Sequence, residues 1–235
     1  MKVLLDAGHG GHDSGARGNG LNEKDIALAV TLKLGEILKR HKIEVFYSRT
    51  KDEFIELSER ARVANRNKID AFVSLHCNSF SNAQAQGVEV FSYPNSADGK
   101  KLSQNILDSI MKDKLYTKNR GIKTDNFAVL RETNMTAVLV ELGFISNKED
   151  AAILVNKQDE LASAVAKGIL KYLRIAYKEE AVTNSLDDQY EKAVKELVNV
   201  GIIGSPGAWH NLETVHVNNV KSLVVKMAAY ITQGI

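Results

Sequence analysis

The chain has 235 residues, of which 44% are hydrophobic, so it can bury one large core and still leave room for a small appended unit. It carries 31 Lys and Arg against 29 Asp and Glu, without a basic run, which argues against nucleic acid as a partner. No apolar stretch is long enough for membrane insertion.

The first half of the chain alternates strands and helices. An apolar strand near the N-terminus runs into a glycine-rich loop that ends at Ala16. Hydrophobic spacing then predicts a helix over residues 23–40, a strand over 43–47, a helix over 57–65 and a strand over 69–75. This order favours a parallel sheet.

The pattern continues to residue 177. We predict a strand over 88–93, a helix over 97–112, a polar surface loop over 116–126, strands over 127–130 and 137–140, and helices over 147–156 and 160–177. The fold class is therefore α/β, a mostly parallel twisted sheet flanked by helices on both faces.

A polar stretch without periodicity, residues 179–185, predicts a linker after a catalytic domain over 1–178. Residues 186–235 then show two helical stripes, one from Tyr190 and one from Val217, with Trp209 available for a small core. We expect a small, mainly helical domain that docks on the first one or pairs with a copy of itself.

Three predicted strands lead to a potential metal ligand: His9, His76 and Glu141. Glu23 begins the first helix, across the glycine loop. Imidazole and carboxylate ligands suit zinc, and a spare carboxylate beside the metal suits a general base. Spacing alone does not decide whether Glu23 or Glu141 is the ligand.

Each of these residues also has a simpler explanation. His76 resembles a core histidine bonded to a backbone carbonyl, and Glu23 complements the dipole of its helix. His12 and Asp13 read as polar loop residues. Cys77, the single cysteine, reads as a small buried apolar group; it excludes an internal disulfide and suits a reducing compartment.

Four segments, in this order, carry a family resemblance: Asp6-Ala7-Gly8-His9-Gly10-Gly11, Asn22-Glu23-Lys24-Asp25, Ser74-Leu75-His76-Cys77-Asn78 and Val138-Leu139-Val140-Glu141-Leu142-Gly143-Phe144-Ile145-Ser146-Asn147. Together they resemble the zinc-dependent N-acetylmuramoyl-L-alanine amidases of the amidase-3 type. Ala7 and Thr136 stand where the family often has proline, which puts loop stiffness rather than the ligands in doubt.

The resemblance implies that His9, Glu23 and His76 hold Zn2+ and that Glu141 is catalytic. The implied reaction is hydrolysis of the amide between the lactyl group of N-acetylmuramic acid and the L-alanine of the stem peptide in peptidoglycan. Asn78 and Arg131, each near a predicted strand end, are candidates for positioning this substrate.

Residues 186–235 faintly resemble the wall-binding domains of phage endolysins and bacterial autolysins, although a dimerisation unit fits as well. Two other functions remain open: a nucleotide-binding α/β enzyme, although Asp13 replaces the third glycine of its loop motif, and an inactive cell-wall-binding module. Since the N-terminus lacks a signal-peptide pattern, we expect cytoplasmic synthesis and action on the cell wall after release by a holin or by lysis.

Overall fold

The computed structural model describes residues 1–179, 192, 193, 195, 224, 225, 227 and 228. The chain divides into two compact units, Met1–Lys178 and Glu179–Ile235. Apart from Glu179, the described residues of the second unit are helical, whereas Trp209 and most of both expected helical stripes lie outside the described residues. In the described part of the chain, every helix is too short or too polar to cross a membrane.

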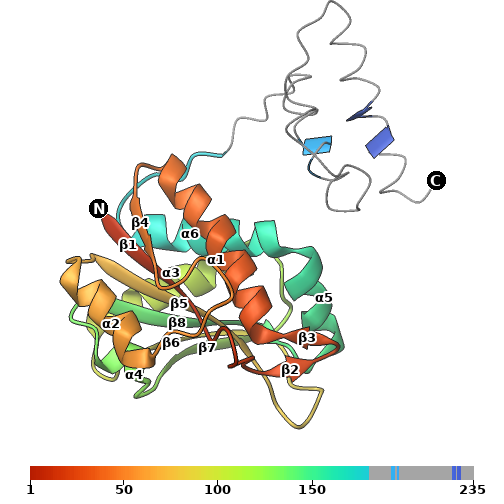
Figure 1. The fold of residues 1–235 in the computed structure, drawn as a ribbon, viewed down its shortest axis with the longest axis horizontal. Helices are drawn as coiled ribbons and strands as arrows, with labels where there is room; N and C mark the ends of the chain where they lie inside the picture. Colours follow the sequence, from red (N-terminus) through yellow and green to blue (C-terminus); the bar gives the residue numbers. More distant parts are fainter. Residues whose placement is uncertain (180–191, 194, 196–223, 226, 229–235) are drawn as a thin grey trace, which may run out of the picture. The chain divides into compact units, whose positions relative to one another are not determined.

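The first unit is built around a six-stranded sheet with the strand order β4-β1-β5-β8-β6-β7 (Figure 1). Its strands are β1 (Lys2–Ala7), β4 (Glu44–Tyr47), β5 (Ala71–Asn78), β6 (Val88–Ser92), β7 (Asn119–Thr124) and β8 (Thr136–Phe144). All neighbouring pairs are parallel except β6 and β8, which are antiparallel. A short hairpin of β2 (Arg17–Gly18) and β3 (Leu21–Asn22) lies apart from this sheet.

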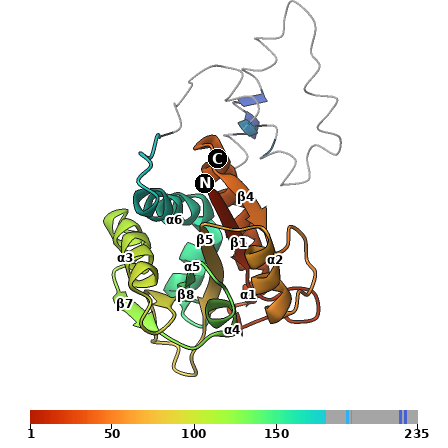
Figure 2. The ribbon, with the colours of Figure 1, turned by 90° about the vertical axis from the view of Figure 1, so that its left-hand side faces the viewer.

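Helices cover both faces of the sheet, which confirms the predicted α/β class. The helices are α1 (Glu23–Arg40), α2 (Leu57–Arg66), α3 (Ala97–Lys112), α4 (Ala128–Arg131), α5 (Lys148–Asn156) and α6 (Gln158–Tyr172). Figure 2 shows α3 and α6 on one side of the sheet and α2 on the other. The larger core lies under α1, α3 and α6, because their apolar stripes meet the buried side chains of β1, β5 and β8.

The smaller core lies on the opposite face, where Leu4, Phe72 and Leu139 pack under α2 and α4. These two helices cover only part of that face. Toward the carboxyl ends of β1, β5 and β8, the side chains on this face change from apolar to polar, beginning with the buried Asp6 and Ser74. The fold therefore leaves a polar surface at the edge of the sheet where ligands bind in α/β proteins.

Two predicted elements were wrong. Residues 116–126 are not only loop, because they contain the edge strand β7, whose sequence Asn119–Thr124 has one large apolar residue, Ile122. An edge strand needs few apolar side chains, so it lacks the usual signal. Residues 127–130 are not a strand, because residues 128–130 belong to the single-turn helix α4, which Phe127 precedes; a short apolar run does not distinguish a strand from a helix.

Candidate metal centre

Adjacent strands deliver the candidate ligands to one place. His9 follows β1, and His76 lies in β5, which pairs with β1. In the register between β5 and β8, His76 stands opposite Glu141. Residues that pair in this way point to the same face of a sheet, so the two side chains share the polar surface.

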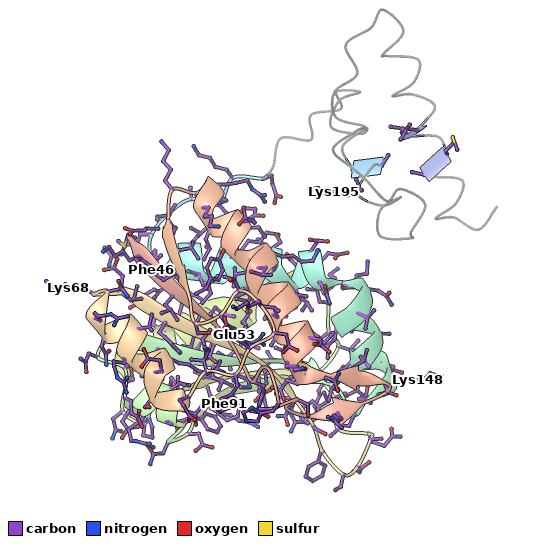
Figure 3. The ribbon with its side chains drawn as sticks, viewed as in Figure 1. Phe46, Glu53, Lys68, Phe91, Lys148 and Lys195 are labelled. Carbon is purple, nitrogen blue, oxygen red and sulfur yellow. The ribbon has the colours of Figure 1, made fainter. Side chains whose placement is uncertain are left out.

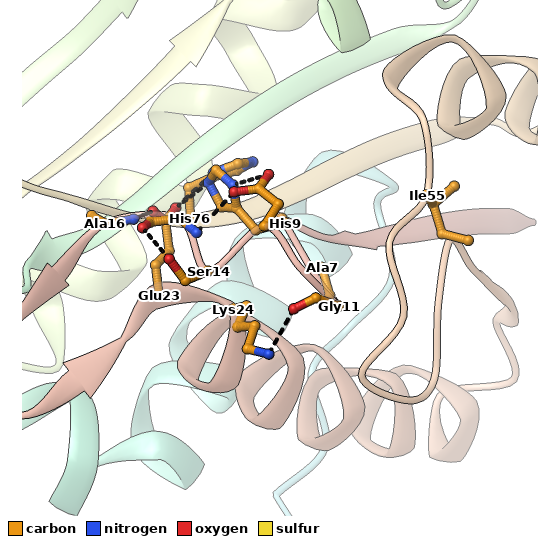
Figure 4. Close-up of polar contacts among 12 residues, drawn as sticks. Ala7, His9, Gly11, Ser14, Ala16, Glu23, Lys24, Ile55 and His76 are labelled. Atoms are coloured by element: carbon orange, nitrogen blue, oxygen red, sulfur yellow. Dashed lines mark hydrogen bonds and ion pairs between the residues drawn. The ribbon is translucent and has the colours of Figure 1, made fainter.

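The side chains of His9, Glu23 and His76 converge on one point (Figure 4). Glu23 Oε1 lies 3.1 Å from His9 Nε2 and 2.8 Å from His76 Nδ1. The two imidazole rings are nearly perpendicular, with centroids 4.9 Å apart. Around a tetrahedral zinc with bonds near 2.1 Å, neighbouring donor atoms are roughly 3.4 Å apart, so these donors need to separate by only about 0.3–0.6 Å to hold such an ion.

Backbone donors fix the carboxylate of Glu23. Its Oε2 accepts a hydrogen bond of 2.8 Å from the amide of Ala16, and its Oε1 accepts one of 3.0 Å from the amide of Cys77. Glu23 is 4% exposed although it begins a helix, where an acidic side chain would ordinarily reach solvent. The helix-dipole explanation is therefore incomplete, because this carboxylate points into the cluster.

Two glycines make the space that the cluster occupies. A Cβ atom added to Gly8 would lie 2.7 Å from Nδ1 of His76. One added to Gly15 would lie 2.6 Å from Oε2 of Glu23 and from Cδ2 of His9. Any side chain at either position would displace a donor, so the glycine-rich loop is shaped around this site.

Asp13 orients His9, a role that the sequence analysis missed. Its Oδ2 lies 2.8 Å from Nδ1 of His9, and its Oδ1 accepts a hydrogen bond from the amide of Gly15. A carboxylate on the far nitrogen fixes the ring orientation of a metal-binding histidine and directs the other nitrogen to the metal. The i, i+4 spacing of His9 and Asp13 within the loop was the available signal.

Two buried arginines hold the loop by its carbonyl groups. Arg49 donates to the carbonyl oxygens of Ala7, Gly8, Lys24 and Lys51. Arg60 donates to those of Ala7, His9 and Ile55 and forms a 2.7 Å ion pair with Asp6. Because Arg49 bonds both to the loop and to the first turn of α1, it joins the segment before His9 to the helix that begins at Glu23.

Glu141 faces the cluster with an unpaired oxygen. Among the described residues, its buried Oε2 has no hydrogen-bond partner. Burial raises the pKa of Glu141 to about 7, and the carboxylates of Glu23 and Glu89 also raise it, against the opposing effect of His76. A carboxyl group with a pKa near neutrality can both accept and return a proton.

The charge of the cluster favours a bound cation. Burial lowers the pKa of His9, but the carboxylates of Glu23 and Asp13 outweigh it and raise this pKa to about 9. Burial likewise opposes protonation of His76, whose pKa Glu23 nevertheless raises. The pKa of Glu23 is lowered, because hydrogen bonds from both histidines overcome the effect of its burial. The carboxylates thus attract positive charge to the point where the three side chains meet.

A cavity of about 460 Å3 opens beside the cluster. One wall carries His9, His76 and Glu141, and a second, mostly apolar wall is formed by residues 54–57 at the start of α2 and residues 127–129 at the start of α4. The apolar residues of this wall are Phe54, Ile55, Leu57, Phe127 and Val129. Figure 3 labels Glu53, the residue that precedes Phe54 of this wall, near the middle of the view. An extended substrate with methyl-bearing groups fits such a cavity.

The other candidates take different positions. Asn78 ends β5 and donates to Glu89, outside the cavity that holds the cluster. Arg131 ends α4, contrary to the predicted strand end, and bonds to Asn126 and Glu132 rather than lining the cavity. Cys77 is buried in the larger core.

The sequence matches the N-acetylmuramoyl-L-alanine amidase family (Amidase_3) over residues 3–171. It is 38% identical over 206 residues to the endolysin of Bacillus phage SPP1, covering 84% of this chain and 75% of the endolysin. It is 35% identical over 187 residues to the sporulation-specific N-acetylmuramoyl-L-alanine amidase of Bacillus subtilis, covering 79% and 71%.

Solved structures show the same fold. The N-acetylmuramoyl-L-alanine amidase AmiC2 of Nostoc punctiforme superimposes with a TM-score of 0.71 at 39% identity, covering 74% of this chain and 97% of that one. The catalytic domain of CwlV from Bacillus (Paenibacillus) polymyxa gives 0.71 at 38% identity, covering 74% and 99%. The matched 74% of this chain corresponds to about the length of Met1–Lys178, the unit that holds the cluster.

Proposed function

The chain belongs to the N-acetylmuramoyl-L-alanine amidase family, and on that basis we propose that it is a zinc-dependent peptidoglycan hydrolase whose reaction uses His9, Glu23, His76 and Glu141. The single observation that carries the proposal is the convergence of His9, Glu23 and His76 within 4.8 Å, on the same face as the unpaired oxygen of Glu141.

Two imidazoles and one carboxylate are a donor set of catalytic zinc sites, which keep one position open. Gly8 and Gly15 lie so close to these donors that a side chain at either position would displace one of them. When bound, zinc supplies Lewis acidity toward the lactyl carbonyl group and acidifies the attacking water. Asp13 holds the ring of His9 in the orientation that turns Nε2 to the metal.

Glu141 then moves the proton. Its carboxylate accepts a proton from the water that attacks the lactyl carbonyl carbon. As the carbon–nitrogen bond breaks, the same carboxyl group returns that proton to the amine of L-alanine.

The test measures zinc content and the release of stem peptide from purified peptidoglycan, with and without a chelator. We expect about one zinc per chain and cleavage that the chelator abolishes and added zinc restores. Glu141→Gln should keep zinc and lose turnover, whereas His76→Ala should weaken zinc binding and turnover together. A metal-free, inactive preparation that takes up no added zinc contradicts the proposal and favours the wall-binding module.

The remaining parts of the proposal concern the whole chain. The likeness to a phage endolysin supports action on the cell wall after release by a holin or by lysis. The second unit would bind the wall or form a homodimer. Replacing Trp209 with Ala and measuring sedimentation with purified walls tests wall binding; unchanged binding by the folded variant removes Trp209 from it.

A further inference from the structure

A row of charged residues crosses the polar face of the sheet beyond the metal cluster. His76 pairs in register with Glu141 on β8, and Glu141 pairs in register with Glu89 on β6. The next strand, β7, is the edge of the sheet and supplies Arg120 and Lys123. The row thus runs from the metal cluster to a cationic edge.

Glu89 is buried beneath three donors. Its Oε2 accepts bonds of 2.7 Å from Arg120 Nε and 2.6 Å from Lys123 Nζ, and its Oε1 accepts one of 2.7 Å from Asn78 Nδ2. The side chain of Glu89 is 3% exposed, whereas those of Arg120 and Lys123 are 29% and 39% exposed. Two cations share this carboxylate, and Arg120 also interacts electrostatically with Asp150.

Arg120 retains hydrogen-bonding capacity. Its Nε is used by Glu89, and its Nη1 has a long contact of 3.5 Å with the carbonyl oxygen of Gln86. Its Nη2 has no hydrogen-bond partner among the described residues. The guanidinium carbon lies 4.7 Å from the centroid of the Phe144 ring, which holds the plane of the group in place.

The guanidinium lines a second cavity of about 420 Å3. Three amide side chains share this cavity with it: Asn78, Asn82 and Gln84. An arginine with a free nitrogen, surrounded by amides, has the chemistry that recognises a carboxylate on a peptide. Asn78, a substrate candidate from the sequence, belongs to this cavity rather than to the metal site.

We propose that this second cavity is a subsite for a carboxylate of the stem peptide and that Arg120 binds it. The inference rests on the proposed amidase function and identifies a carboxylate as the feature of the stem peptide that this chain recognises. The guanidinium of Arg120 reaches Glu89 on β6, and β6 is two strand spacings of about 4.8 Å, roughly 10 Å, from β5, which carries the metal-ligand candidate His76. An extended residue spans about 3.5 Å, which places the carboxylate two to three residues beyond the scissile amide.

The test compares two synthetic N-acetylmuramoyl tripeptides, one with free carboxylates and one with all carboxylates amidated, as substrates of the full chain with zinc. For the natural sequence, we expect KM for the free acid to be about 10- to 100-fold lower than for the amidated peptide. Arg120→Ala should bring this ratio close to one. Arg120→Lys, which keeps a cation beside Glu89, should lower it in part, and Lys118→Ala, which removes an exposed cation before β7, should leave it unchanged.

Calorimetric binding of the free tripeptides to the same proteins separates this proposal from the amidase function. If neither muropeptide is cleaved, the amidase function fails, yet tighter binding of the acid tripeptide that Arg120→Ala abolishes still supports the subsite. The proposal is overturned if the natural sequence does not distinguish acid from amide. It is also overturned if both Arg120 variants retain the full ratio.

Discussion

Replacing Gly8 with alanine tests whether the loop is shaped around the metal ligands. The backbone at Gly8 is not left-handed, so alanine brings no conformational strain. Its Cβ would lie 2.5 Å from Nε2 of His76 and closer still to Cε1, whereas unstrained contacts begin at ~3.5 Å. The imidazole must therefore retreat by about 1 Å, several times the ~0.2 Å that a metal–ligand bond tolerates.

We expect Gly8→Ala to weaken zinc binding by at least ~10-fold, equivalent to about 1.4 kcal/mol, because one of the three ligands leaves its position. Competition with a chromophoric chelator measures the affinity, and circular dichroism checks that the fold persists. Gly35→Ala is a matched control, because its Cβ would lie 2.6 Å from Cζ of Tyr47 and displaces a ring far from the metal. Undiminished zinc affinity in Gly8→Ala, or an equal loss in Gly35→Ala, would refute the reasoning.

Three further predictions concern orientation, packing and pH. Asp13→Ala should weaken zinc binding by ~10- to 100-fold because His9 loses its orienting carboxylate, as the same chelator competition measures; an unchanged affinity contradicts that role. Gly168→Ala should lower stability by about 1–3 kcal/mol in urea unfolding without changing zinc affinity, because its Cβ would press on the backbone of α3. Burial raises the pKa of Asp6, but the charge of Arg60 and the hydrogen bonds to Asp6 outweigh this effect and lower the pKa below its ordinary value. The ion pair therefore stabilises the fold above the ordinary carboxyl pKa. Melting temperatures should therefore fall as the pH drops below about 4, and less steeply in Asp6→Asn than in the natural sequence.

The metal cluster was predictable because its position follows from topology. Apolar strands with a polar residue at the carboxyl end are visible in the sequence, and a parallel sheet brings such ends together. That logic selected His9, His76 and Glu141 as candidates, and the structure places their side chains on one face of the sheet. It could not choose between Glu23 and Glu141 as the ligand, since the choice depends on how α1 enters the site, which the backbone bonds of Ala16 and Cys77 determine.

The carboxylate subsite was not predictable because it depends on an edge strand. Glu89 alternates with valines, which is typical of a half-exposed strand, yet it is buried. Its partners Arg120 and Lys123 belong to β7, which the sequence shows only as a polar stretch. Only the pairing of β6 with β7 explains why a carboxylate at position 89 is buried.

Arg49 and Arg60 donate hydrogen bonds to the loop before His9, so the conformation of this loop does not depend on a bound metal. In many small zinc domains the metal itself organises the ligands, so its binding energy is consumed in folding the chain. Here donors on Arg49 and Arg60 satisfy the carbonyl groups of the loop. In the proposed zinc site, the affinity for the metal would then be available almost entirely for capture of the ion, and a chain that has lost its metal would keep a receptive shape and regain the ion without refolding.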